Sequence, residues 1–161
     1  MLTTKAIDSR FENFAERSVF VQAYSRGEMH DFNQGKEDEY PRMHTICKGA
    51  TYQDNIKRLS YEIYFLSLPN SDHNDEDQLQ IVSDMERVAE DLLIELFLHQ
   101  TAAQPDTTGD TSYLKVNRGT DFGIAYEDAN ITPMVESTKN VLCGVRLDLS
   151  IVVGWRKLQN V

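Results

Sequence analysis

The stretch "VLCGVRLDLSIVV", Val141–Val153, has the most regular hydrophobic pattern in the chain. Every second side chain is apolar, which is the period of a β-strand. The apolar face holds Val141, Cys143, Val145, Leu147, Leu149, Ile151 and Val153. The other face mixes apolar and polar residues: Leu142, Gly144, Arg146, Asp148, Ser150 and Val152. The pattern predicts a long strand with one buried face and one mixed face.

Arg146 and Asp148 are the two charged residues on the mixed face of this strand. That face could meet a second helix, a neighbouring subunit or water. An ion pair at a subunit interface and a solvated strand face both account for the two residues, and no surrounding motif decides between them.

A helical pattern precedes this strand, over about residues 75–101. Its apolar residues step by four, three, four and four: Ile81, Met85, Val88, Leu92 and Leu96. A second row widens the apolar stripe: Val82, Ala89, Leu93 and Phe97. A stripe this wide is typical of a helix packed against a sheet, not of a narrow coiled-coil seam.

The remaining elements are read from shorter patterns. Residues 2–17 predict a short amphipathic helix with Ile7, Phe11, Phe14 and Ala15 on one stripe. Strands are expected over residues 18–25, over 43–53 with a break near Gly49, and over 56–69, where Pro69 ends the ladder. "YLKVNR" (113–118) is a further strand candidate, and Gly119–Asn140 reads as short extended pieces mixed with turn residues.

These elements predict one domain over residues 1–161, of the α+β class (an α/β sandwich). Short connections between consecutive strands favour antiparallel pairing. We therefore expect a mainly antiparallel sheet, packed by one long helix (about 75–101) and a short N-terminal helix.

The acidic residues before the long helix raise the question of a calcium loop. A loop starting at Asp72 would place Asp77 where the pattern needs glycine and Ser83 where it needs glutamate. A loop starting at Asp75 fails as well, because Leu79 occupies a ligand position. The residues fit a helix N-terminus instead, where short polar side chains cap the amides and acidic ones complement the dipole.

The sequence contains no clear motif for catalysis, nucleotide binding or metal binding. The four histidines stand alone, and the chain has no Cys-x-x-Cys, nucleophile elbow, Walker loop or dinucleotide fingerprint. We expect Cys47 and Cys143 to be free buried thiols, and carboxylate pairs on the long helix to be surface residues. The prediction is a protein that is not an enzyme and uses no cofactor or metal.

Composition sets further bounds. The net charge is −10, from 26 acidic and 16 basic residues, which disfavours tight binding to nucleic acid. No apolar run approaches the roughly 18 residues of a membrane span, and the charged N-terminus is unlike a signal peptide. We expect a soluble protein, made in the cytoplasm, with no membrane partner.

Three segments of the chain together carry a resemblance to a known family. They are "YPRMHTICKG" followed by "LSYEIYFLSLP", the helix "DEDQLQIVSDMERVAEDLLIEL", and "NITPMVESTKNVLCGVRLDLSIVV", in which a Thr-Pro turn leads through Gly144 into the final strand. The pattern, spanning Tyr40 to Val153, is similar to head–tail joining and tail-completion (tail terminator) proteins, especially the ring proteins of crAss-like phages.

The resemblance implies a virion protein that forms a hexameric or dodecameric ring at the neck or upper tail. Its partners would be portal, connector or tail proteins, assembly would take place in the host cytoplasm, and DNA would pass through the lumen without specific binding. The family has no catalytic residues to carry over.

The long loops Arg26–Tyr40 and Gly119–Asn140 are expected to make subunit contacts. The candidate subunit-interface residues are Arg146, Asp148, Phe122, Tyr126 and Pro133. Two alternatives stay open: a tail-assembly adaptor or chaperone, and an α+β ligand-binding or enzymatic domain. Candidate groups for such a domain are Asp148, Arg146, His44 and Tyr61.

Overall fold

The computed structural model describes residues 3–27, 40–53, 56–68, 75–102, 125–137 and 141–154. These residues form two helices and one five-stranded sheet, which confirms the predicted α+β class. The elements follow the chain in this order: α1 (Thr4–Arg17), β1 (Ala23–Arg26), β2 (Arg42–Gln53), β3 (Ile56–Ser67), α3 (Asp75–Ala102), β4 (Ala125–Ser137) and β5 (Val141–Gly154).

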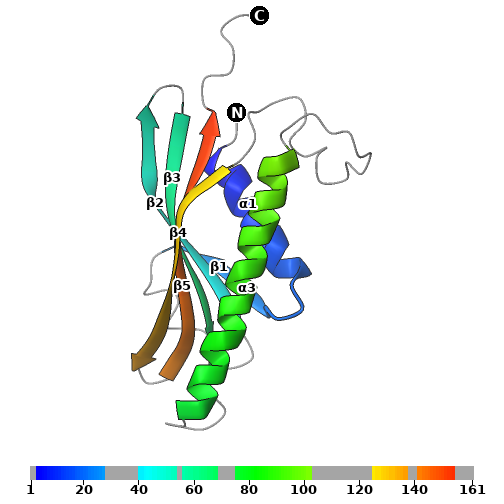
Figure 1. Ribbon diagram of the computed structural model, residues 1–161, viewed down its shortest axis with the longest axis vertical. Coiled ribbons are helices and arrows are strands. Elements are labelled where there is room, and N and C mark those ends of the chain that lie inside the picture. The colour runs from blue at the N-terminus through cyan, green and yellow to red at the C-terminus, as the bar shows by residue number, and fades with distance from the viewer. Residues whose placement is uncertain are drawn as a thin grey trace, which may run out of the picture.

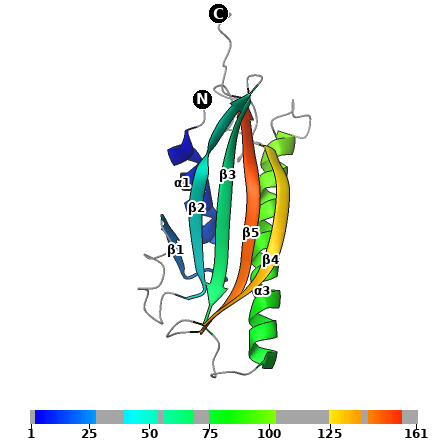
Figure 2. The same ribbon diagram turned by 90° about the vertical axis from the view of Figure 1, so that its left-hand side faces the viewer.

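The strands lie in the order β1-β2-β3-β5-β4. Three of the four pairings are antiparallel, as predicted, and only β1 runs parallel to its neighbour β2. The segment between β1 and β2 is long enough for the return that parallel pairing needs. Figure 1 shows both helices on one side of the sheet, and Figure 2 shows the opposite side with the helices behind it.

The core lies between this sheet and the two helices. On β5 the predicted apolar face is buried: Cys143, Val145, Leu147, Leu149 and Ile151. The stripe of α3 packs onto it through Met85, Val88, Ala89, Leu92 and Leu96. β3 and β5 contribute alternate side chains to this layer and β2 adds Met43, so the sheet's buried face is continuous from β2 to β5.

Helix α1 covers the β1–β2 end of the same face. Its N-terminus is capped by the Thr3 hydroxyl, which accepts a hydrogen bond from the Ala6 amide at 3.2 Å. The predicted stripe is buried: Ile7, Phe11, Phe14 and Ala15. The Phe11 ring meets the Tyr61 ring edge to face, with centroids 5.1 Å apart.

Two predicted elements differ from the structure. The strand expected over residues 18–25 is only Ala23–Arg26, because Ser18 ends α1 and the apolar pair Val19 and Phe20 that follows is exposed. The segment expected to be short pieces and turns contains one 13-residue strand, β4, and the expected Thr132-Pro133 turn lies inside it.

The predicted break near Gly49 and the predicted start of the long helix agree with the structure. The break near Gly49 corresponds to a register shift in β2 between Cys47 and Gly49. The helix expected from about residue 75 begins at Asp75. The candidate strand 113–118, Pro69 and the polar residues 70–74 lie outside the described residues.

Candidate subunit interface on the open face of the sheet

The side of the sheet turned away from α1 and α3 is called the open face here. No helix in the described ranges lies against it (Figure 2). The strand register brings residues that are far apart in sequence together on this face. Tyr64 of β3 lies opposite Arg146 of β5, and Glu62 lies opposite Asp148.

Among the described residues, three ion pairs occupy the open face. Arg146 Nε lies 3.0 Å from Asp148 Oδ2 within β5. Lys48 Nζ lies 3.2 Å from Glu62 Oε1, which links β2 to β3. Arg58 Nε lies 3.3 Å from Glu127 Oε2, which links β3 to β4 across β5. All three pairs are partly exposed, so each contributes little to stability in isolation, typically under about 1 kcal/mol.

The charges also influence one another's protonation. Burial alone raises the pKa of Glu62, but hydrogen bonds from Tyr64 and Lys48 outweigh it, and the net pKa lies below its usual value. Burial and the hydrogen bond to Glu62 raise the pKa of Tyr64 to about 12. The contact with Asp148 raises the pKa of Arg146. At neutral pH the face therefore presents fixed charges of both signs.

An apolar cluster lies beside these charges on the same face. Its buried members are Ile46, Tyr64, Leu66 and Leu142, and Tyr40, Leu68 and Met134 pack against them. Tyr64 belongs to both groups, because its ring is buried and its hydroxyl donates to Glu62 Oε2 at 2.8 Å. The mixed face predicted for β5 is thus apolar at Leu142 and charged at Arg146 and Asp148.

His44 is fully buried and ties β1 to β2. Its Nε2 donates to the Gly27 carbonyl at 2.9 Å, so Nδ1 accepts from the Ser25 hydroxyl at 2.7 Å. The Ser25 oxygen in turn accepts from Arg42 Nε at 2.9 Å. A serine and a histidine in this contact resemble a nucleophile and base. The full burial of the ring favours a structural role instead.

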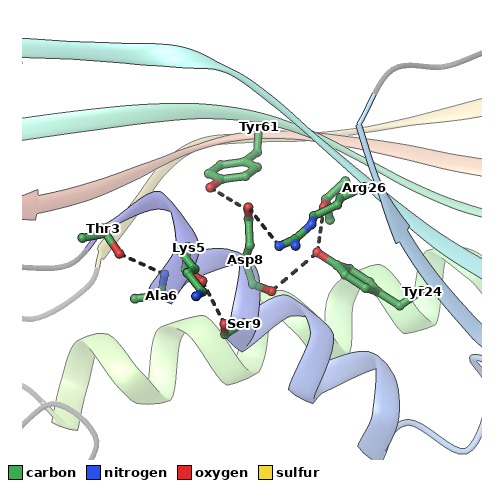
Figure 3. Close-up of polar contacts among 9 residues, drawn as sticks. Thr3, Lys5, Ala6, Asp8, Ser9, Tyr24, Arg26 and Tyr61 are labelled. Atoms are coloured by element: carbon green, nitrogen blue, oxygen red, sulfur yellow. Dashed lines mark hydrogen bonds and ion pairs between the residues drawn. The ribbon is translucent and has the colours of Figure 1, made fainter. Parts of the chain in front are cut away.

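Tyr61 lies on the other side of the sheet, in a polar cluster under α1 (Figure 3). Its hydroxyl donates to Asp8 Oδ1 at 3.1 Å, and Arg26 Nη1 lies 3.8 Å from Asp8 Oδ2. Tyr24 shares a 2.9 Å hydrogen bond with Thr45. Burial raises the pKa of both Asp8 and Tyr61. The four groups named for a ligand site are therefore split between two faces and do not converge.

The structure places the candidate interface residues as follows. Arg146 and Asp148 lie together on the open face. Tyr126 and Pro133, expected in a loop, lie in β4, where Tyr126 packs against the helix-side core and Pro133 is exposed. Phe122 lies outside the described residues. The ion-pair partners Lys48, Glu62, Arg58 and Glu127 were not predicted, since only the strand register brings them together.

The structure also bears on the two cysteines and on possible metal sites. Both cysteines are free, but Cys47 is exposed and only Cys143 is buried, so the expectation for Cys47 was wrong. Cys47 comes directly after the buried β2 residues Met43–Ile46, where the strand continues into an exposed segment. Within the described ranges, no group of three or more His, Cys, Asp or Glu side chains is arranged to hold a metal ion.

Comparison with known proteins adds no assignment. No family model matches the chain, and no curated protein matches it. In the part of the chain that the structure describes, no helix is both long and apolar enough to cross a bilayer.

Proposed function

We propose that this protein is a structural subunit of an oligomeric ring at the head–tail interface of a tailed phage, at the neck or at tail completion. The ring joins the portal or connector to the tail, and DNA passes through its lumen without specific binding. The subunit carries out no catalysis.

The observation that carries the proposal is the open face of the sheet. It presents three ion pairs on strands that are held rigidly by a packed core on the other side. Charges of both signs on a rigid face can determine the orientation and register of a contact with another molecule. The resemblance of Tyr40–Val153 to ring proteins of tailed phages supports the same function.

The charge of the chain is also consistent with this function. A net charge of −10 repels the phosphate backbone, so DNA could move through a lumen lined by this protein without being held. The groups considered for a ligand-binding or enzymatic domain lie on opposite sides of the sheet, and no second function is proposed.

Mass spectrometry of purified phage particles tests this proposal. The particles are produced from the genome that encodes the chain, and its copy number is compared with that of the portal protein. We expect the chain at a fixed ratio to the portal, as one ring per particle requires. A chain that is present in infected cells but absent from particles would instead be an assembly chaperone or adaptor.

A further inference from the structure

Two surfaces on opposite sides of the molecule differ in charge. One is the open face of the sheet, and the other is the outer stripe of α3, which consists of the exposed residues of that helix: Leu79, Gln80, Ser83, Glu86, Arg87, Glu90, Asp91 and Ile94. The sheet and the core lie between them, because α3 packs its inner side on the core (Figure 1). The two surfaces therefore point in roughly opposite directions.

The outer stripe is acidic with exposed apolar residues at each end. Its exposed charges, among the described side chains of α3, are three carboxylates, Glu86, Glu90 and Asp91, and one base, Arg87. Leu79 is 70% exposed and Ile94 is 57% exposed. A helix surface with this composition disfavours packing against the same surface of another copy, because like charges would face each other.

The open face differs because its bases are accessible. In two of its three ion pairs the base is the more exposed partner: Lys48 at 52% against Glu62 at 21%, and Arg146 at 37% against Asp148 at 32%. An approaching carboxylate would meet these bases first. In the third pair the acid is the more exposed partner, Glu127 at 46% against Arg58 at 35%, so the open face carries three bases and three acids and is the less acidic of the two surfaces. It can therefore receive the carboxylates of the α3 outer stripe without the repulsion that two such stripes would meet.

Strand addition at the β4 edge is a less suitable contact. Pro133 lacks a backbone N–H, and the register of β4 shifts between Glu127 and Asn130, where Asp128 has a φ of 55°. Proline and a bulge on an edge strand both hinder pairing with a further strand. The edge that could extend the sheet from one copy to the next is therefore interrupted in its middle.

We infer that the open face of one copy binds the outer stripe of α3 of the next copy. The contact is head-to-tail, and repetition of such a contact closes a ring when the rotation between copies allows it. The inference rests on the proposed ring and names the two surfaces that build it.

Charge reversal on each surface tests the contact. The helix variant carries Glu86→Lys and Glu90→Lys. The sheet variant carries Lys48→Glu and Arg146→Glu, with Glu62→Gln and Asp148→Asn so that no new carboxylate pair is created within the subunit. The control variant carries Glu12→Lys and Glu16→Lys, exposed positions on α1 outside both surfaces. Circular dichroism and thermal melting establish that each variant folds, and native mass spectrometry measures assembly.

We expect each reversed variant alone to need at least about tenfold more protein to assemble than wild type or the α1 control. An equal mixture of the two variants should assemble at a protein concentration within about threefold of that of wild type. In a ring of alternating variants, every second contact joins the two reversed surfaces, and the contacts between them join two unreversed surfaces. Normal assembly of either variant alone, or failure of the mixture, overturns the contact. A wild type that stays monomeric up to about 100 μM overturns the ring itself.

Discussion

At Gly144, a side chain as small as a methyl group should disrupt the pairing of β5 with β3. A Cβ there would lie 1.9 Å from the carbonyl oxygen of Phe65 on the neighbouring strand, and φ is 156°. Backbone, not a movable side chain, occupies the space. We expect Gly144→Ala to cost about 3 kcal/mol or more of unfolding free energy, measured by urea denaturation.

Gly49 offers the matched control for this prediction. Its φ is 140°, but a Cβ would meet nothing within 4 Å. Gly49→Ala should therefore cost only the conformational strain, about 1 kcal/mol. Equal losses for the two variants would contradict the close approach of β3 to β5 at Gly144.

Asp8 should make stability depend on pH in a direction opposite to that of most carboxylates. Burial raises its pKa above the ordinary 3.8, so the folded state holds this proton more tightly than the unfolded chain does. Stability is therefore lost as pH rises from 3.8 through the raised pKa. Asp8→Asn keeps an oxygen that can accept from Tyr61 but does not ionise, so its stability relative to wild type should increase between about pH 3 and about pH 7.

Denaturant midpoints at several pH values measure this effect. Tyr61→Phe removes the hydrogen bond to Asp8 and should cost about 1 kcal/mol. Because that bond lowers the pKa of Asp8, its loss should raise the pKa further and strengthen the dependence of stability on pH. If the difference between Asp8→Asn and wild type were constant over the whole range, Asp8 would not be the source of the pH dependence.

Helix α3 provides the test at the level of elements. Leu92 is 2% exposed on the sheet-facing stripe, and truncation to alanine should cost about 2–5 kcal/mol. Ile94, two residues on, is 57% exposed, and Ile94→Ala should change stability by less than about 0.5 kcal/mol. Thermal melting of the two variants measures the difference. Comparable losses would mean that α3 is rotated from the orientation described.

The sequence predicts best those elements in which the pattern of apolar residues repeats without interruption. The alternation in β5 and the three-four steps of α3 follow from burial on one side only, and both elements were predicted closely. β4 was missed for a physical reason. Its bulge puts Tyr126 and Ile131, five residues apart, on the same side of the sheet, and an edge strand tolerates Pro133.

The candidate interface was only partly predictable for a related reason. Arg146 and Asp148 are neighbours on one face of one strand, so their pairing follows from the period of two. Lys48, Glu62, Arg58 and Glu127 belong to three other strands, and their pairing depends on the order β2-β3-β5-β4. A single sequence contains no direct record of that order.

At the scale of the whole molecule, the protein is a plate with helices on one side and an open sheet face on the other (Figures 1 and 2). The core fixes the distance between the two sides, so in the proposed ring each copy would pass its orientation to the next. A heterologous contact between such plates gives either a closed ring or an open filament, depending on the rotation per subunit.

Native mass spectrometry of the purified wild-type protein over a range of concentrations tests the ring most directly. The account predicts one closed species, a hexamer or a dodecamer, in equilibrium with monomer and with few intermediates. It would be contradicted by monomer alone at every concentration, or by a ladder of masses that lengthens as concentration rises, which is the behaviour of an open filament.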